Sequence, residues 1–562
     1  MEKVWFKNYE SGVPHEIDLT RYASLVQITQ ENFKKYKDKP AFRNMGKSIS
    51  YHELDTLSTH FAAFLQNTLE CKKGDRLIIM LPNILQYPVV MFGAQRAGLI
   101  VVNVNPLYTP REVRHVIKDS GAKTIVVLEN FAHTIEQVKK EDPSLKFSVI
   151  TATIGDLLGY KGVLVNWVVR YLKKMVPSYH LPDALPFNAV LKKGQSLAFH
   201  PVDLNRNDVA YLQYTGGTTG VPKGAMLTHG NMIANILQAS AWLTKTLEKP
   251  ITGGIITALP LYHIFSLTAN CLTFMQAGMV NILITNPKDM SGFIKELKRQ
   301  PFSFMTGVNT LFNALLHHPD FKSIDFKDLL LTLGGGMAVQ EAVATKWKQA
   351  TGVALIQAYG LTEASPAVAM GPMNIQDFNN SVGLPVPSTD IKICDETGQE
   401  LGFDTPGELY VKGPQVMLGY WNDVKATKEV LDDAGWLKTG DIATVDQEGF
   451  VRIVDRKKDM ILISGFNVYP SEVEAVISSM PGIKEVAVIG ASDVRHGEKI
   501  QAYIVLTQDA EKTINANQVI AFCRKQLTNY KVPKEIFFRQ ELPKSNVGKI
   551  LRRALKEEAK LN

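Results

Sequence analysis

The feature that most constrains the fold is a regular alternation of helical and strand-like segments between residues 50 and 130. Ser50 and Glu53 have the spacing of a helix capping box, and apolar residues follow them on one helical face. Strand-like runs and helical patterns then alternate, at residues 77–81, 88–97, 99–104, 111–118 and 124–128. Strands joined through helices pair in parallel by right-handed crossovers, so this region is predicted to form an α/β domain.

A second unit is predicted near the C-terminus, because 562 residues exceed what one hydrophobic core usually supports. A strand-like stretch at 450–454 runs into the charged residues 455–459. Beyond them short strands alternate with helical stretches, at residues 471–478, 486–489, 502–506, 517–527 and 536–538. We therefore expect a large domain of parallel-type sheets covered by helices, residues 1–455, and a small mobile α+β lid domain, residues 456–562.

Composition narrows the class of protein. Residues 1–10 carry charges throughout, and no apolar run is long enough to span a bilayer. The net charge of +7 fits anionic small molecules or acidic lipids and does not by itself indicate nucleic acid, so no nucleic-acid partner is expected. The cysteines are too far apart to indicate a disulfide framework or a metal site, which favours a reducing, cytoplasmic location. They are Cys71, Cys271, Cys394 and Cys523.

A glycine- and threonine-rich segment, residues 214–224, follows a strand-like run at 209–213. Glycines allow backbone N–H groups to surround phosphate oxygens, threonine hydroxyls add donors, and a lysine adds positive charge. The spacing does not fit a Walker A loop, which disfavours kinases and GTPases; the plain alternative is a surface turn. The predicted nucleotide contacts are Tyr214, Thr215, Gly216, Gly217, Thr218, Thr219, Gly220 and Lys223.

This segment resembles the signature loop of the adenylate-forming enzymes, which include acyl-CoA synthetases, nonribosomal-peptide adenylation domains and firefly luciferases. Further strings similar to that family follow in its order, at residues 259–265, 334–338, 359–363, 435–441, 455–456 and 543–549. The N-terminal region and residues 413–421 and 435–465 resemble bacterial long-chain fatty acid:CoA ligases of the β-oxidation type. The resemblance extends along nearly the whole chain.

The resemblance implies a reaction in two steps, with Mg²⁺ as cofactor and ATP and coenzyme A as co-substrates. A fatty carboxylate attacks the α-phosphorus of ATP and expels pyrophosphate, and the CoA thiol then displaces AMP. Each step concentrates negative charge, so cations and oriented donors should dominate catalysis. By this resemblance Glu363 is the Mg²⁺ ligand, Thr362 contacts the α-phosphate, Lys549 bridges carboxylate and α-phosphate, His263 borders the acyl site, and Gly336 belongs to the nucleotide site.

The remaining implied contacts concern the nucleoside and CoA. Tyr359 is expected against adenine, Asp441 at the ribose hydroxyls, and Arg456 at ribose or phosphate, whereas Ser464 and Gly465 are expected at CoA. By residue type alone each has a plainer interpretation, since tyrosines fill cores, aspartates occupy turns and charge runs are usually solvated. Lysines in a basic tail are likewise usually only exposed, and a lone histidine is more often a satisfied core residue.

A long acyl chain requires an apolar tunnel, and burial of each methylene contributes about 0.8 kcal/mol. Phe265 and residues 306–312 are the expected lining by family position. A ligase for medium-chain or aryl acids is the alternative within the family, and a carrier-linked adenylation domain is another. A nucleotide-binding scaffold without chemistry is the alternative of a different class.

The segment 162–176 is predicted to form an amphipathic helix. Its apolar residues fall three and four apart, and basic residues lie on the other side. Trp and Tyr among them suit the surface of an anionic bilayer, so we expect peripheral contact with the cytoplasmic face of the membrane. Packing against the protein's own core is the equally weighted alternative.

Overall fold

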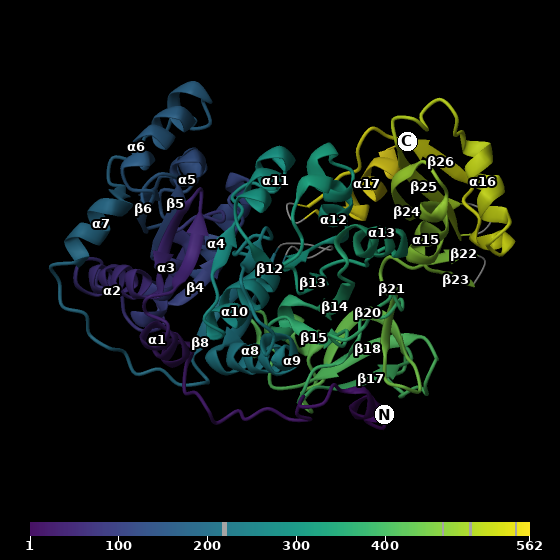
Figure 1. Cartoon of the computed structure of the whole chain (residues 1–562), viewed down its shortest axis with the longest axis horizontal. Coiled ribbons are helices and arrows are strands. Elements are labelled where there is room, and N and C mark those ends of the chain that lie inside the picture. The colour runs from purple at the N-terminus through teal and green to yellow at the C-terminus, as the bar shows by residue number, and fades with distance from the viewer. Residues whose placement is uncertain (216–221, 464–465, 494–496, 546–547, 562) are drawn as a thin grey trace.

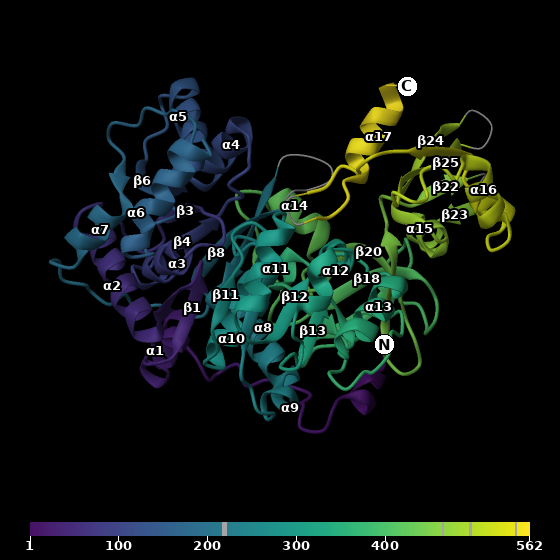
Figure 2. The same ribbon diagram turned by 45° about the horizontal axis from the view of Figure 1, so that its top comes forward.

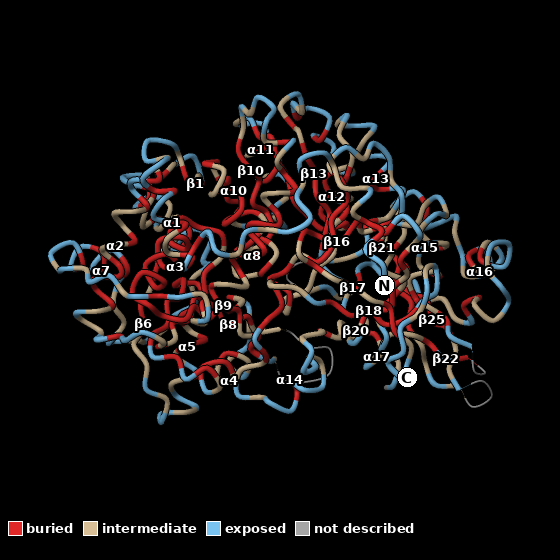
Figure 3. The backbone as a smooth tube through the Cα atoms, turned by 90° about the horizontal axis from the view of Figure 1, so that it is seen from below, coloured by how far each residue is buried: buried red, intermediate tan, exposed pale blue. Residues whose placement is uncertain are grey.

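The computed structural model describes residues 1–215, 222–463, 466–493, 497–545 and 548–561. The predicted α/β class and the division into a large N-terminal and a smaller C-terminal domain are confirmed (Figure 1). Buried segments concentrate in the strands of the large domain and in the helices packed on them (Figure 3). Among the described residues no helix is long and apolar enough to cross a membrane.

The predicted alternation between residues 50 and 130 builds the centre of an eight-stranded sheet. In spatial order its strands are β19 (Gly419–Tyr420), β9 (Lys223–Thr228), β8 (Val209–Thr215), β4 (Ile100–Asn103), β3 (Arg76–Met80), β5 (Thr124–Leu128), β6 (Ser148–Ala152) and β7 (Leu185–Pro186). The associated helices are α2 (Tyr51–Asn67), α3 (Gln86–Arg96), α4 (Pro110–Ser120), α5 (Ala132–Glu141) and α7 (Phe187–Gly194). Ser50 and Glu53 form the predicted capping box of α2, which fixes where that helix begins.

A nine-stranded sheet forms the second layer of the large domain. Its strands are β16 (Leu384–Pro385), β15 (Ala367–Met370), β14 (Leu355–Gly360), β13 (Leu331–Gly334), β12 (Phe302–Gly307), β10 (Gly254–Thr257), β11 (Asn281–Leu283), β1 (Pro40–Asn44) and β2 (Lys47–Ser50). Its helices include α1 (Leu25–Lys35), α8 (His229–Trp242), α10 (Thr273–Gln276), α11 (Met290–Arg299), α12 (Asn309–Leu316) and α13 (Glu341–Thr351).

The sheets are mixed, whereas the sequence pattern indicated parallel pairing. The central strands of both large sheets are parallel, but β8 pairs antiparallel with β9, and β14 with β15. Short connections can join only antiparallel neighbours, since a parallel crossover needs a dozen or more residues. The antiparallel pairs β8–β9 and β14–β15 therefore form where a short connection joins two strands that are consecutive in the chain.

A four-stranded antiparallel sheet leads to the lid domain. It contains β17 (Asp390–Cys394), β18 (Gly407–Lys412), β20 (Leu437–Val445) and β21 (Val451–Arg456). The lid sheet contains β22 (Ile461–Ile463), β23 (Phe466–Val468), β24 (Ile483–Asp493), β25 (Gly497–Leu506) and β26 (Glu535–Phe538), with helices α15 (Pro470–Ser479), α16 (Ala516–Arg524) and α17 (Arg552–Leu561). The chain passes from one sheet to the other in residues 457–460; the boundary at 455/456 stays a prediction, because β21 itself extends through Arg456.

Candidate active site

The predicted phosphate loop joins the antiparallel strands β8 and β9. Their register sets Tyr214 opposite Gly224 and Thr215 opposite Lys223, so the loop leaves and re-enters the sheet at one point. The Tyr214 hydroxyl donates to Asp119 Oδ2 at 2.6 Å, which fastens this end of the loop to α4. The rest of the loop lies outside the described residues, and its nucleotide contacts stay predictions; these are Gly216, Gly217, Thr218, Thr219 and Gly220.

Lys223 and Glu363 both contact the side chain of Tyr420. Pairing of β19 with β9 places the Lys223 Nζ 5.4 Å from the centroid of that ring. The Tyr420 hydroxyl donates to Glu363 Oε1 at 2.8 Å. Glu363 and Thr362 belong to a short 3₁₀ helix, η6 (Thr362–Ala364), directly after β14. A cation of the loop and the predicted magnesium ligand are thus held at one aromatic side chain.

Asp441 joins Tyr359 and Arg456. The β20–β21 register places Asp441 opposite Arg456, whose Nε lies 2.9 Å from Asp441 Oδ1. The Tyr359 hydroxyl donates to Asp441 Oδ2 at 2.5 Å. Burial and the charge of Asp441 raise the pKa of Tyr359, so its hydroxyl keeps its proton. Three residues predicted to contact the nucleotide therefore form one hydrogen-bonded group.

Lys549 reaches this group from the lid domain. Its side chain is exposed to solvent and lies within electrostatic reach of Arg456 and Asp441. Desolvation and repulsion by Arg456 lower the pKa of Lys549 to about 8, opposed by attraction to Asp441. The neighbouring Gly548 carbonyl accepts a hydrogen bond from Thr310 Oγ1 of α12 at 3.2 Å. With φ +81° and a Cβ position 2.7 Å from Thr310 Oγ1, residue 548 needs to be glycine for this approach.

His263 follows β10 and lies within electrostatic reach of Lys549. Burial and the positive charge of Lys549 lower the pKa of His263 to about 4, so the imidazole is neutral at physiological pH. Its Nδ1 accepts from the Phe265 backbone N–H at 3.3 Å, which assigns the ring proton to Nε2. Gly336, after β13, has φ +77°, and a Cβ on its neighbour Gly335 would lie 3.1 Å from the Phe265 ring. The glycines after β13 therefore leave room for the Phe265 ring at the end of that strand.

The phosphate loop, Glu363 and Asp441 lie on the large domain, and Lys549 lies on the lid domain. This division corresponds to that of a known family: AMP-binding enzymes match residues 29–421, and their C-terminal domain matches residues 472–549. This chain belongs to the AMP-binding enzyme family.

Relatives of this AMP-binding enzyme agree with the match. A long-chain-fatty-acid–CoA ligase of Escherichia coli O157:H7 is 52% identical over 561 residues, which cover 100% of this chain and 99% of that protein. The ATP-bound MatB structure from Rhodopseudomonas palustris has a TM-score of 0.80 at 28% identity, covering 95% of this chain and 99% of that one. The anthranilate CoA ligase AuaEII in complex with anthranoyl-AMP has a TM-score of 0.84 at 24% identity, covering 97% and 99%, and shows the shared fold.

The structure of this AMP-binding enzyme adds contacts that the sequence did not reveal. Tyr420 lies within the string 413–421, but its bond to Glu363 joins residues 57 positions apart and leaves no local pattern. Thr310 was expected in the acyl lining, whereas it holds the lid loop through Gly548. Ser464 and Gly465 lie outside the described residues, so their contact with CoA stays a prediction.

Glu363 fits the Mg²⁺ site predicted for it. One carboxylate oxygen is held by Tyr420, and no described residue hydrogen-bonds to the other, Oε2. Mg²⁺ commonly binds through one or two carboxylates together with substrate phosphates. The unbonded carboxylate oxygen of Glu363 is a hard ligand of the kind that such a site requires.

Proposed function

We propose that this AMP-binding enzyme is a long-chain fatty acid:CoA ligase of fatty acid degradation. It forms acyl-AMP and pyrophosphate from a fatty acid and ATP, and then acyl-CoA and AMP. The full-length similarity to long-chain-fatty-acid–CoA ligases supports the reaction. The observation that carries the choice of acid is an apolar cavity close to the candidate site.

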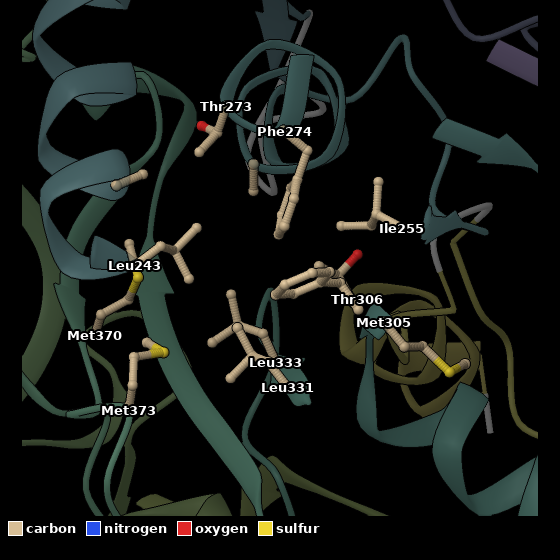
Figure 4. Close-up of a pocket in the computed structure, with 13 residues that line it drawn as sticks. Leu243, Ile255, Thr273, Phe274, Met305, Thr306, Leu331, Leu333, Met370 and Met373 are labelled. Carbon is tan, nitrogen blue, oxygen red and sulfur yellow. The ribbon is translucent and has the colours of Figure 1, made fainter. Parts of the chain in front are cut away.

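The cavity is small, about 30 Å³, and lies between α8, the helical segment 266–276 and strands β10, β12 and β13 (Figure 4). Its lining is almost wholly apolar, with Ala239, Leu243, Ile255, Ala269, Thr273, Phe274, Phe304, Met305, Thr306, Leu331, Leu333, Met370 and Met373. The lining hydroxyls need no water, because Thr306 Oγ1 donates to Asn270 Oδ1 at 2.8 Å and Thr273 Oγ1 donates to the Thr268 carbonyl at 2.9 Å. Such a surface suits an alkyl chain.

The cavity adjoins the predicted carboxylate site through Phe265. The Phe265 ring packs against the core cluster that contains Phe274 and Leu333, which both line the cavity. Its backbone N–H bonds to His263, as described above. An acyl chain in the cavity would therefore point its carboxylate towards His263 and Lys549. Of the expected lining segment 306–312, only Thr306 faces the cavity; Phe312 packs against Trp347 in another core cluster.

In this proposal the carboxylate oxygen attacks the α-phosphorus, and the bond from that phosphorus to the departing pyrophosphate breaks. Lys549 and Thr362 stabilise the charge that develops on the α-phosphate, and Lys223 binds the distal phosphates. Asp441 binds the ribose hydroxyls, with Tyr359 and Arg456 orienting it. A Mg²⁺ ion at Glu363 would neutralise phosphate charge when bound. The CoA sulfur then attacks the acyl carbon, and AMP leaves with the electrons of the cleaved bond.

A bulkier side chain in the cavity tests whether the substrate is a long-chain acid. Ala239→Phe should lower kcat/KM for long-chain acids by about tenfold or more and leave short-chain acids nearly unchanged, since each lost methylene contact costs about 0.8 kcal/mol. The measurement is AMP and acyl-CoA release over acids of graded chain length. Ala241→Phe, on the same helix but outside the cavity lining, is the matched control. A wild type indifferent to chain length would contradict a long-chain substrate, and equal losses at every length would exclude the cavity as the acyl site.

We also propose that the segment 160–175 contacts an anionic membrane surface. It forms α6 (Tyr160–Trp167), continues in a π-helical turn, η3 (Val168–Leu172), and lies at the end of the molecule opposite the lid domain (Figure 1). The helix thus begins before the predicted residue 162 and ends before residue 176. Val169 of this segment is buried and Val165 packs against the core. Its other large apolar side chains are mostly at least half exposed: Tyr160, Val163, Leu164, Trp167, Tyr171, Leu172 and Met175.

Two polar side chains of this helix, Asn166 and Arg170, bond to the protein beneath it. Gly162 packs so closely on Gly155 that a Cβ there would lie 2.0 Å from its carbonyl oxygen. Asn166 accepts from the Gly155 N–H at 2.7 Å, and Arg170 pairs with the buried carboxylate of Glu129. The inward side thus mixes polar and apolar groups, whereas a core-packed amphipathic helix buries its large apolar side chains. This orientation supports the interfacial alternative, and the exposed Lys161, Lys173 and Lys174 favour anionic lipid.

Replacing Trp167, Lys173 and Lys174 with glutamate should lower binding to phosphatidylserine-containing liposomes by about tenfold or more, because each basic residue contributes about 1 kcal/mol near such a surface. Co-sedimentation measures the bound fraction, and activity on detergent-dispersed substrate should persist. The matched control, Val424→Glu with Lys425→Glu and Lys428→Glu in α14 (Val424–Val430), makes the same charge change on another exposed helix. Undiminished binding of the first variant would exclude this surface.

A further inference from the structure

Arg552, the first residue of α17, lies in a cluster of acidic groups at the passage between the two domains. Its guanidinium donates to both carboxylate oxygens of Glu474, at 3.1 and 2.7 Å, and to Asp455 Oδ1 at 3.2 Å. Weaker bonds of 3.4 Å reach Asp459 Oδ2 and Ser471 Oγ. We call these five residues the hinge cluster.

The hinge cluster joins segments on both sides of the domain boundary. Asp455 belongs to β21 of the large domain, and Glu474 and Ser471 belong to α15 of the lid domain. The Asp455 side chain is 1% exposed and that of Arg552 is 17% exposed. Asp455 Oδ2 also accepts from the Ser471 N–H at 2.7 Å. A single guanidinium, only partly exposed, therefore fixes the start of α17 to the strand before the boundary and to the helix after it.

The hinge cluster is adjacent to the candidate active site along two chain segments. Asp455 precedes Arg456, which pairs with Asp441. Arg552 lies three residues after Lys549 in the sequence. Helix α17 lies on the side of the lid domain that faces the large domain (Figure 2). Any displacement of the start of α17 would move the loop that carries Lys549.

We propose that Arg552 is a positioning residue for acyl-adenylate formation. Its bonds fix the start of α17 to both sides of the domain boundary and so hold Lys549 near Asp441, Tyr359 and Arg456. This inference rests on the proposed function of Lys549. Arginine suits the role because its planar fork bonds to several carboxylates at once, which a lysine ammonium on a flexible stem does not reproduce. The plainer interpretation is an ion-pair network that stabilises the lid domain without affecting either half-reaction selectively.

The two interpretations predict different effects of a substitution at Arg552 on the two half-reactions. Arg552→Lys keeps the charge but loses the fork, and it should lower kcat for acyl-AMP formation by about 10- to 100-fold, since small misplacement of a catalytic group has effects of that size. KM for ATP should change by less than about threefold, because the nucleotide contacts of the large domain remain. Conversion of preformed acyl-AMP and CoA to acyl-CoA should stay within about threefold of wild type, because that step does not need Lys549 at the α-phosphate.

Arg553→Lys is the matched control, because Arg553 is exposed and, among the described residues, pairs only with Glu557 in its own helix. Thermal unfolding is measured for every variant; if Arg552→Lys does not fold, Glu474→Gln, which keeps shape and weakens the same clamp, is judged by the same selective loss. Selective loss of acyl-AMP formation supports the proposal. Equal loss in both half-reactions, or loss in neither, overturns it, whereas a wild type that forms no acyl-AMP would overturn the proposed function itself.

Discussion

Replacement of Lys549 with alanine is expected to lower the rate of acyl-AMP formation by roughly 100- to 1,000-fold or more, the effect of removing one preorganised donor from a developing oxyanion. Lys549 is the cationic side chain of the lid domain that lies within electrostatic reach of the group formed by Asp441, Tyr359 and Arg456. In that group Arg456 is already paired with Asp441, so its charge is partly neutralised. The loss of the lysine charge should therefore be poorly compensated.

The same variant should convert preformed acyl-AMP to acyl-CoA at a substantial rate, because thiol attack on the acyl carbon does not involve a cation at that position. Pyrophosphate release and acyl-CoA formation measure the two half-reactions separately. Lys544→Ala is the control, since Lys544 lies in the same loop region and pairs with Glu485. Equal loss in both half-reactions would show that Lys549 acts in folding or in lid placement.

The pH dependence of acyl-AMP formation follows from the same residue. The pKa of Lys549 is lowered to about 8, so the free enzyme carries the required ammonium below that pH and loses it above. We expect kcat/KM for ATP to fall as pH rises through about 8, whereas kcat should fall at higher pH, because bound polyphosphate stabilises the ammonium. Lys549→Ala should abolish this limb of the profile.

The fold was largely predictable because its determinants are local. Ser50 and Glu53 form a capping box within four consecutive residues, and the apolar run 124–128 is confirmed as β5 to the residue. The antiparallel additions to the sheets were not predicted, because strand direction depends on which strands meet in space. The boundary of the lid domain was placed from the charge run 455–459, yet some of those charges are buried in the hinge cluster.

The site was predictable only in its residues. Strings along the chain predict Glu363, Asp441 and Lys549, and their roles stay predictions; the bonds around Glu363 and beside Lys549 come from partners far away in sequence, Tyr420 and Thr310. The acyl lining illustrates the limit. Residues 302–307 form one strand, of which Phe304, Met305 and Thr306 line the cavity, and residue type does not reveal that selection.

The segment 162–176 shows what periodicity can and cannot determine. The spacing set Asn166 and Arg170 apart from Leu164, Trp167 and Tyr171, but Lys173 and Lys174, predicted on the same side as Asn166 and Arg170, are exposed. Which of the two sides faces the protein depends on the partners beneath the helix. Buried Glu129 and the Gly155 backbone supply polar partners there, and Leu164, Trp167 and Tyr171 are left exposed.

Glu363→Gln is expected to lower acyl-AMP formation at limiting Mg²⁺ by about 100-fold, because the amide keeps the shape of the carboxylate but not the charge that binds a hard cation. Glutamine retains an oxygen that accepts from the Tyr420 hydroxyl, so the packing around residue 363 should persist. A loss of activity in this variant would thus report on the charge.

The decisive measurement is the Mg²⁺ dependence of pyrophosphate release. Excess Mg²⁺ should restore the rate only in part, because phosphate oxygens still bind the ion while its protein ligand is weakened. Glu429→Gln, which makes the same change within α14, should leave the Mg²⁺ dependence at the wild-type value. Kinetics of Glu363→Gln identical to wild type at low Mg²⁺ would show that the carboxylate is not a ligand. The bond from Tyr420 would then be its main role, and Tyr420→Phe rather than Glu363→Gln would impair the enzyme.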